Sequence, residues 1–330
     1  MRRRINPRHK QQGVALIIAL ILVALAAILA TKLSFDGWLE RRRTLGVLAA
    51  EQALHFGWGA EALAADALGQ TPVGQPVTLA QPWAQPTQPL PLTPENNPEG
   101  EPIGTLQGAL EDLQGRFNLN NLGAVTPPPD SKLDPLPLEQ FQRLLVSVGL
   151  ERKWAGIARD WITDTDVPSS PDGAKDAIYT AQTPPYRTGE WPMMSASELM
   201  NLPGFGADRY RKIAPYVTAL PTATAKINIC TASGYVLDSL LPEGLNNEYA
   251  GNPELLITGR KSGCFPELGA FQSILGKSLT ATAPLFAQTS TYFRLTTHVT
   301  LGTTEFTLYS LLWRTGGGKV TPLLRTFGTP

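Results

Sequence analysis

The N-terminus combines a short basic segment with a long apolar one, and this pair constrains the fold more than any other feature. Residues 1–13 contain five basic residues and no acidic one. Seventeen apolar residues follow without interruption, from Val14 to Ala30, before Thr31 and Lys32 break the run. At about 1.5 Å per helical residue the run spans roughly 26 Å, close to the ~30 Å hydrocarbon core of a bilayer. With the Lys32 side chain reaching to the interface, the sequence predicts a transmembrane helix over residues 14–33.

The basic flank should stay in the cytoplasm, so everything after residue 32 should lie outside, on the far side of the membrane. Three interpretations of the segment remain open: a secretory signal peptide, a plain single-span anchor and a prepilin-like leader. A signal peptide fits poorly because the apolar run is long and only Ala27–Thr31 offers a weak cleavage site. Gly13 at the boundary between the basic and apolar segments is the kind of position at which prepilin peptidases cut.

The segment resembles a class III prepilin leader. Cleavage between Gly13 and Val14 would remove all five basic residues and leave a new amine at Val14, the site of N-methylation in such proteins. Pilins and most pseudopilins have Glu at the fifth mature position, whereas this chain has Ile18. A carboxylate inside a bilayer needs a partner such as the N-terminal amine of a neighbouring subunit. A subunit without it cannot make that contact, and this departure resembles the K subunit at the tip of type II secretion systems.

Composition limits the remainder of the chain to globular structure. Charged residues make up 17% and hydrophobic residues 42%, which excludes a generally disordered chain. The 29 prolines exclude an all-helical bundle. Without the five N-terminal bases, 23 basic residues remain against 28 acidic ones. This sign disfavours nucleic acid as a partner.

Hydrophobic periodicity predicts an order of elements after the membrane helix. Residues 34–68 have helical spacing, and the Pro-rich stretch 71–102 predicts an extended connector. Gly104 to Leu122 is expected to form a strand pair that turns near Asp112 to Gly115.

The second half changes from helix to sheet. Residues 136–163 and 195–218 are predicted to be helical, on either side of an acidic loop at 164–192. The last part alternates as a sheet does, since Phe293, Leu295, Val299 and Leu301 share one face. Turns at Gly302-Thr303 and Gly316–Gly318 then predict a three-stranded antiparallel meander.

Nearly the whole chain resembles the minor pseudopilin K family of type II secretion systems. Four stretches carry the resemblance: the leader with Ile18, LQGRFNLNNL at 113–122, the DWITDTD…PDG…PPYR run at 160–187, and the closing meander. The resemblance implies an α+β, pilin-like fold, in which a long N-terminal transmembrane helix and an antiparallel sheet are joined by a large inserted α-helical domain. It also implies a complex with the I and J minor pseudopilins, which caps or initiates the periplasmic pseudopilus for protein export.

These features predict five segments. They are a prepilin leader at 1–13, a transmembrane helix at 14–33, a first pilin-like part at 34–122, an inserted α-domain at 123–225, and a second pilin-like part at 226–330.

The acidic loop is a candidate cation site. Asp164, Asp166, Asp172 and Asp176 lie close together in the sequence, and only Lys175 offsets them. Ca²⁺ accepts six to eight oxygen ligands in irregular loops, although the spacing is not that of an EF-hand. The alternative is a solvated turn with Asx caps. The resembled family binds calcium in its α-domain, which favours a Ca²⁺ site at the four aspartates, with Glu190 as a weaker further ligand.

The two cysteines, Cys230 and Cys264, both lie on the periplasmic side of the predicted membrane helix. An even pair in an oxidising compartment predicts a disulfide. It would stabilise the fold by roughly 3–4 kcal/mol in the chain-entropy model. Two buried free thiols are the alternative.

Two segments resemble the turn of a helix-hairpin-helix, which often presents backbone amides to DNA phosphates. They are Leu202–Gly206 followed by Ile213, and Ile227–Ser233 with Arg260 and Phe265. Acidic residues accompany the basic ones around the first turn, and the mature chain is acidic. A DNA-binding minor pilin of an uptake pilus is therefore only the alternative function.

Enzymatic chemistry finds little support in the sequence. The three histidines, His9, His55 and His298, lie in the leader, on the anchor helix and on a predicted strand. None is near a nucleophile motif, and no HExxH, Walker A or GxGxxG pattern occurs. The sequence therefore predicts an assembly protein without catalytic activity.

Overall fold

The structure is a computed structural model. It describes residues 12–85, 87–94, 97, 99–123, 136–169, 171–240, 252–260, 262–265, 283–302 and 304–328. The chain divides between His55 and Phe56 into two compact units. The basic residues of the predicted leader lie outside the described residues.

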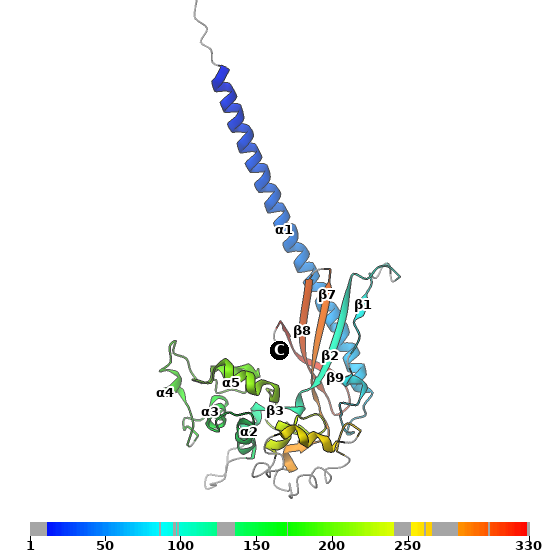
Figure 1. Cartoon of the computed structure of the whole chain (residues 1–330), viewed down its shortest axis with the longest axis vertical. Helices are drawn as coiled ribbons and strands as arrows, with labels where there is room; N and C mark the ends of the chain where they lie inside the picture. Colours follow the sequence, from blue (N-terminus) through cyan, green and yellow to red (C-terminus); the bar gives the residue numbers. More distant parts are fainter. Residues whose placement is uncertain are drawn as a thin grey trace, which may run out of the picture. The chain divides into compact units, whose positions relative to one another are not determined.

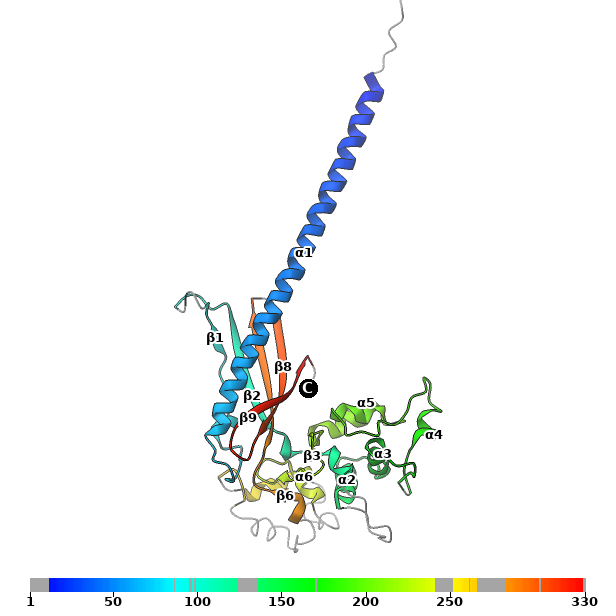
Figure 2. The ribbon, with the colours of Figure 1, turned by 180° about the vertical axis from the view of Figure 1, so that it is seen from behind.

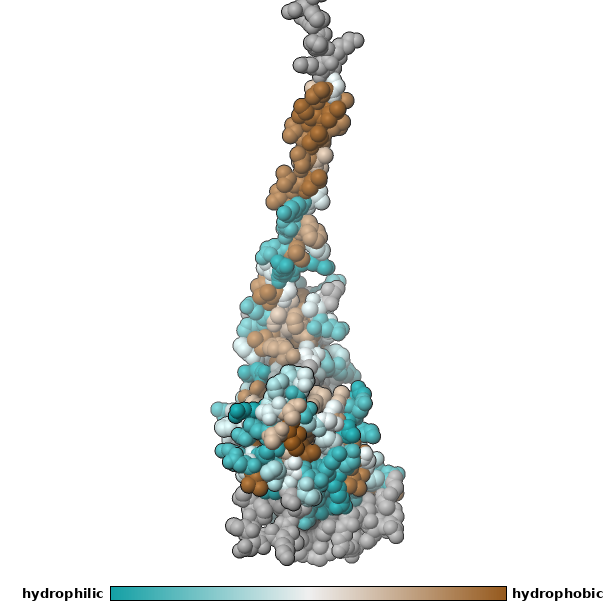
Figure 3. Space-filling model, turned by 90° about the vertical axis from the view of Figure 1, so that its left-hand side faces the viewer, coloured by the Kyte–Doolittle hydropathy of each residue, from teal (hydrophilic) through white to brown (hydrophobic). Residues whose placement is uncertain are grey.

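A single α-helix, α1, runs from Gln12 to Gly69 (Figure 1). Among the described residues, its N-terminal part is the one stretch long and apolar enough to cross a membrane, with a mean hydropathy of 3.1. That stretch is not buried in the protein, and apolar side chains cover the face of it seen in Figure 3. Its apolar surface has to be covered by lipid or by other helices. The helices predicted over 14–33 and 34–68 are therefore one continuous helix.

The second unit contains a five-stranded sheet beside the end of α1 (Figure 1). Its strands are β1 (Leu90–Leu92), β2 (Gly104–Asp112), β7 (Tyr292–Leu301), β8 (Thr304–Arg314) and β9 (Val320–Phe327). They lie in the order β1-β2-β7-β8-β9, and every neighbouring pair is antiparallel. The predicted C-terminal meander is thus confirmed as β7-β8-β9, and β2 extends it into a larger sheet.

The alternation read from the sequence gives the face of the sheet that is buried. Phe293, Leu295, Val299 and Leu301 on β7 are all buried, as predicted. Thr297 lies between them on the same face and is also buried. Side chains at successive positions point to opposite faces, so this face can accept a covering helix.

The last turns of α1 cover the sheet, as Figure 2 shows from behind. At Gly57 the helix comes so close that an added Cβ would lie 2.5 Å from Leu308 Cδ2. One turn further along the helix, Glu61 is only 7% exposed. Its carboxylate lies against the sheet. It accepts hydrogen bonds of 2.7 Å from Ser310 Oγ and from Arg325 Nε and Nη2. This contact joins α1 to β8 and to the last strand, β9.

The prediction that Gly104 to Leu122 forms two strands paired with each other is wrong. β2 pairs with β1 and β7, and it ends where the Asp112 carboxylate accepts a 2.9 Å hydrogen bond from Gln114 N. That cap starts the 3₁₀-helix η2 (Leu113–Gly115), which leads the chain away from the sheet. Beyond it, β3 (Phe117–Asn118) pairs in parallel with β4 (Val217–Thr218).

Short helices make up most of the middle of the chain. The α-helices are α2 (Leu136–Ser147), α3 (Lys153–Ile162), α4 (Asp176–Tyr179), α5 (Gly206–Ile213) and α6 (Gly234–Ser239). The other 3₁₀-helices are η1 (Pro82–Ala84), η3 (Leu119–Gly123), η4 (Ala196–Asn201), η5 (Ala214–Tyr216), η6 (Pro253–Gly259) and η7 (Ala283–Leu285). A second parallel pair joins β5 (Ile227–Asn228) to β6 (Phe286–Ala287). The predicted helix at 136–163 is two helices, because Gly149 between them has φ of 75°.

Nearly all the described buried apolar residues between Phe117 and Phe286 form one cluster. At its centre the rings of Phe117 and Phe141 stack with centroids 5.0 Å apart. The cluster includes residues of α6, η6 and β6, which follow the predicted end of the α-domain at 225. The division of the chain at 123 and 225 stays a prediction.

Leucine substitutions at Gly57 and Gly59 should separate two contributions to the free energy of unfolding, the packing of α1 on β8 and helix propensity. Gly57→Leu is expected to lower the free energy of unfolding by about 1–3 kcal/mol, because the new side chain overpacks against Leu308. Gly59 has open space around its Cβ position, so Gly59→Leu should raise the stability by up to ~1 kcal/mol through helix propensity. Urea unfolding of the full-length protein in detergent, followed by tryptophan fluorescence, measures both. Equal effects at the two positions would contradict the close contact of α1 with β8.

Candidate functional site

The acidic loop folds back onto α3, the helix that precedes it. Asp160 near the end of α3 is 1% exposed. Its carboxylate accepts hydrogen bonds from Ser169 N at 2.9 Å, Ser169 Oγ at 2.6 Å and Ala174 N at 2.9 Å. The buried charge is therefore met by three donors of the protein itself.

The four predicted calcium ligands occupy different surroundings. Asp164, Asp166 and Asp172 are exposed. Asp176 begins α4 and accepts hydrogen bonds from Thr188 N at 3.0 Å and Thr188 Oγ1 at 2.8 Å, which hold the pKa of its carboxyl below the ordinary value. Within the described part of the chain, no three acidic, histidine or cysteine side chains gather as a metal-binding group. Calcium binding stays a prediction.

Glu190, the weaker candidate ligand, also lies beside Thr188. Its Oε1 accepts a 3.3 Å hydrogen bond from Thr188 Oγ1. Thr188 thus donates to both Asp176 and Glu190 and holds the start of α4 beside Glu190.

The predicted disulfide between Cys230 and Cys264 is present, with the two Cα atoms 4.4 Å apart. Arg260 lies next to it and donates to the carbonyls of Ile229 and Ala232. Its guanidinium also lies 5.7 Å from the Phe265 ring centroid. The second segment that resembled a helix-hairpin-helix is therefore a strand, a turn and α6, and Arg260 binds the carbonyls of that turn.

The first helix-hairpin-helix-like segment joins η4 to α5, with positive φ at Gly204 and Gly206. The helix before the turn is a 3₁₀-helix, and Phe205 of the turn packs edge-on against Trp154 with ring centroids 5.1 Å apart. Arg209 pairs with Glu151 at 3.4 Å, and Arg211 pairs with Asp208. Two of the three basic side chains of this segment are thus balanced by carboxylates, an arrangement that offers little to a phosphate backbone.

Three buried asparagines explain the NLNN sequence at 118–121. Asn120 is 3% exposed, donates to Met193 O at 2.9 Å and Leu220 O at 2.8 Å, and accepts from Met193 N at 2.7 Å. Asn118 accepts from Leu220 N, and Asn121 both donates to and accepts from Ala225. Together these three side chains, which we call the asparagine clamp, hold Met193 and residues 218–225 beside η3. The signal in the sequence was polar amides in an otherwise apolar segment.

The buried carboxylate of Asp112 joins the sheet to the helical part. Its Oδ2 accepts from Asn228 Nδ2 at 2.8 Å, Thr231 Oγ1 at 2.6 Å and Ser290 Oγ at 2.6 Å. Burial raises the pKa of the Asp112 carboxyl, while these hydrogen bonds and that from Gln114 N oppose the rise. From the sequence Asp112 is only a turn residue, because the side chains that donate to it lie more than a hundred positions away.

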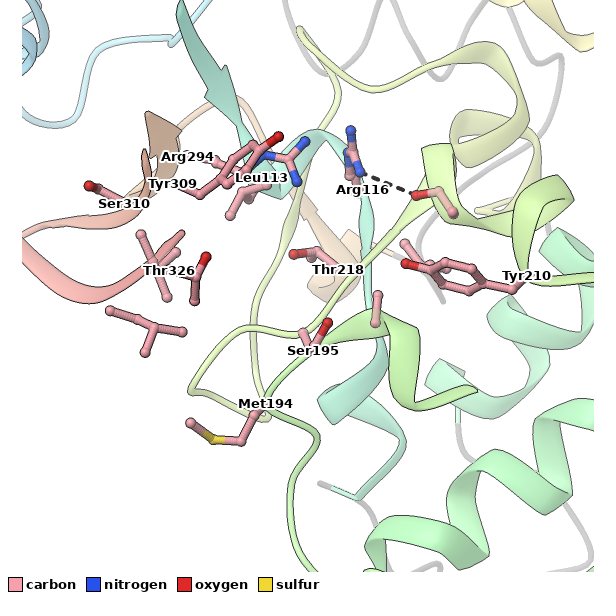
Figure 4. Close-up of a pocket in the computed structure, with 16 residues that line it drawn as sticks. Leu113, Arg116, Met194, Ser195, Tyr210, Thr218, Arg294, Tyr309, Ser310 and Thr326 are labelled. Atoms are coloured by element: carbon pink, nitrogen blue, oxygen red, sulfur yellow. Dashed lines mark hydrogen bonds between the residues drawn. The ribbon is translucent and has the colours of Figure 1, made fainter. Parts of the chain in front are cut away.

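A cavity of about 150 Å³ lies where the sheet meets the helical part (Figure 4). Arg116 and Arg294 line it, and both form ion pairs with Glu111. Arg116 also donates to Ala214 O at 3.2 Å, shown as the dashed line in Figure 4. The rest of the lining combines hydroxyl groups, such as those of Ser195, Thr218 and Tyr210, with leucine, valine, alanine and methionine side chains. The described lining does not combine a nucleophile with a base.

The one histidine on the sheet makes a structural contact. His298 on β7 faces Thr307 on β8, and its Nδ1 lies 3.1 Å from Thr307 Oγ1. The predicted glycine turn at Gly316–Gly318 is likewise a hairpin between β8 and β9, closed by the hydrogen bond from Thr315 N to Lys319 O. Neither element is arranged as a phosphate loop or a catalytic pair.

Known proteins resemble this chain over nearly its whole length. The sequence profile of the family "Type II secretion system (T2SS), protein K" matches residues 115–222. The type II secretion system protein K of Klebsiella pneumoniae is 32% identical, over 97% of this chain and 95% of that protein. The protein of the same name from Pseudomonas aeruginosa is 31% identical, over 97% and 94%.

A solved structure has the same fold. It is the crystal structure of the GspK-GspI-GspJ complex from the type 2 secretion system of enterotoxigenic Escherichia coli. The matching chain has a TM-score of 0.73 and 25% sequence identity, and the match covers 87% of this chain and all of that one. The pilin-like α+β fold expected from the sequence is therefore confirmed.

The asparagine clamp yields a stability prediction. Asn120→Leu keeps the volume but leaves both backbone polar groups of Met193 without partners and removes one of two hydrogen bonds to Leu220 O, so it should lower the free energy of unfolding by about 2 kcal/mol or more. Asn201→Leu, at an exposed position, should change it by less than ~0.5 kcal/mol. Urea unfolding of both variants provides the measurement, and equal midpoints would contradict the clamp.

Asp238 on α6 predicts a pH dependence of stability. The residue is 8% exposed, and burial raises the pKa of its carboxyl from 3.8 to about 6, although the charge of Arg143 opposes this. A raised carboxyl pKa contributes stability below pH 4 that is lost as the pH rises through about 6. Asp238→Asn should therefore remove this loss and stabilise the protein at pH 7 by up to roughly 3 kcal/mol. Unfolding midpoints of both proteins between pH 4 and 7 test this; parallel curves would refute it.

Proposed function

Since the chain belongs to the type II secretion system protein K family and is a minor pseudopilin of that system, we propose that it forms the tip of the pseudopilus. There it assembles with the I and J minor pseudopilins and caps or initiates the fibre that drives protein export from the periplasm. The role is one of assembly, without a catalytic step.

Ile18 is the observation that carries the tip position. It lies 53% exposed on the apolar part of α1, four residues after Val14. A Glu at this point of a pilin-like helix needs a cation from the next subunit, because a lone carboxylate in the bilayer is costly. A subunit with Ile18 does not need a cation from a neighbouring subunit. It therefore suits the end of a fibre, where no subunit follows.

The partners follow from the same fold. The similar chain of known structure was solved in the GspK-GspI-GspJ complex. The compact unit from Phe56 onward combines a sheet with many short helices, so it is bulkier than a helix and sheet alone. Such bulk is hard to accommodate in a tightly stacked shaft, which supports a position at the tip.

Processing by prepilin peptidase belongs to the proposal. Gly13 and Val14 lie in the first turn of α1, and Val14 is 62% exposed. Cleavage after Gly13 gives a mature helix that begins with an N-methylated Val14 and spans the inner membrane once. The remainder of the chain then lies in the periplasm, where the disulfide between Cys230 and Cys264 is stable.

Mass spectrometry of the N-terminus tests the processing step. Protein made with prepilin peptidase should begin at N-methylated Val14, and protein made without it should retain the basic leader. Co-expression with the I and J subunits should yield a stable complex that contains all three chains. A mature N-terminus near Thr31, or recovery of this chain alone, would refute the assignment.

A carboxylate at position 18 should weaken the restriction to the tip. Ile18→Glu restores the group that contacts the neighbouring subunit's amine, so more than one copy should enter each fibre. Ile21→Glu carries the same charge one turn further along the helix and cannot replace it, so its copy number should not rise. Quantitative immunoblotting of purified pseudopili, with the I subunit as reference, measures the ratio. Unchanged copy number in Ile18→Glu would show that position 18 does not set the tip location.

A further inference from the structure

The acidic loop already contains a buried positive charge, the ammonium group of Lys175. The Lys175 side chain is buried, with the residue 8% exposed. Its Nζ donates to Asp160 O at 2.8 Å and to Thr163 O at 2.5 Å. A buried ammonium needs such acceptors, because a charge that is buried without hydrogen-bond partners strongly destabilises the folded state.

These two carbonyls belong to the C-terminal end of α3, which ends at Ile162. The last carbonyls of a helix have no partner within the helix and carry partial negative charge. A cation placed on them is favourable for both reasons. Lys175 therefore caps α3 from a position that follows the helix by a whole loop.

The loop between α3 and Lys175 is closed around Asp160. Three donors of the loop fill the Asp160 carboxylate, as described above. Gly173 passes so close that an added Cβ would lie 2.3 Å from Asp160 Oδ2 and 2.3 Å from Ser169 N. This leaves no space for an ion between the loop and the one fully buried carboxylate.

The other acidic side chains do not complete a cation site around this point. Asp164, Asp166 and Asp172 are exposed, so water screens their mutual repulsion. Asp176 is held by Thr188, and Arg187 lies 3.7 Å from its Oδ2. The charge of Lys175 further lowers the pKa of the Asp176 carboxyl.

We propose that the ammonium group of Lys175, and not a divalent cation, supplies the positive charge that closes this loop. The calcium ligands that the resembled family implies at Asp164, Asp166, Asp172 and Asp176 do not fit the donor set found here. In this chain the carbonyl oxygens of Asp160 and Thr163, which could otherwise coordinate a metal ion, already accept hydrogen bonds from Lys175. The loop and the helices on either side of it therefore keep their fold without calcium.

Thermal unfolding of the full-length protein in detergent tests the proposal, with excess CaCl₂ in one sample and EGTA in the other. A calcium site filled at about 100 times its Kd would raise the Tm by roughly 5–10 °C in a domain of this size. We expect the same Tm in both samples. A calcium-dependent rise that disappears in the Asp164→Asn, Asp166→Asn double variant would overturn the proposal.

Removing the ammonium group provides the second measurement. Lys175→Met keeps the length of the side chain but leaves Asp160 O and Thr163 O without their donor, so its Tm should fall by several degrees in CaCl₂ and in EGTA alike. Lys212→Met, at an exposed position on α5, is the matched control and should keep the wild-type Tm. A wild-type Tm in Lys175→Met, or a loss that calcium restores, would overturn the proposal. If Lys175→Met does not fold, the calcium comparison on the wild-type protein still decides.

Discussion

The buried carboxylate of Asp112 is the point at which the sheet and the helical part are joined. Its two oxygens receive four hydrogen bonds, from Gln114 N, Asn228 Nδ2, Thr231 Oγ1 and Ser290 Oγ. These donors come from three segments that are far apart in the sequence. Because a buried carboxylate without donors is costly, the three segments have to meet there before any of them can be buried. The end of β2, the turn after β5 and the approach to β7 are thereby fixed together.

The same principle organises the helical part, where regular structure is sparse. Short helices leave many backbone groups without partners, and buried backbone groups need them. Side chains supply them here: Asn120 binds both polar groups of Met193, and Lys175 binds the last carbonyls of α3. Arg260 does the same for the turn before α6. Polar side chains thus replace the ladder of hydrogen bonds that a longer helix or a wider sheet would provide.

The apolar part of α1 and the compact unit have different surfaces, and each surface suits a different function. The N-terminal part of α1 is apolar and unburied, so it requires lipid or neighbouring helices. The compact unit buries its own core, and several of its basic side chains form ion pairs with acidic ones, as at Glu111 and Asp208. An apolar helix that can pack against other helices and a bulky head suit the proposed role in assembly.

The sequence by itself determined the long apolar N-terminal helix, the C-terminal meander, the disulfide and the family, because each depends on local periodicity or on residues whose chemistry has few alternatives. It did not determine the partner of β2, since a strand's own pattern gives the buried face but not which neighbour pairs with it. Nor did it give the roles of Asp112, Asn120 and Lys175. In the sequence Lys175 is only the one basic residue that offsets the aspartates of the loop, and the folded chain places its ammonium on the carbonyls of Asp160 and Thr163. Tertiary structure decided these points because a buried polar group is defined by donors and acceptors distant in sequence.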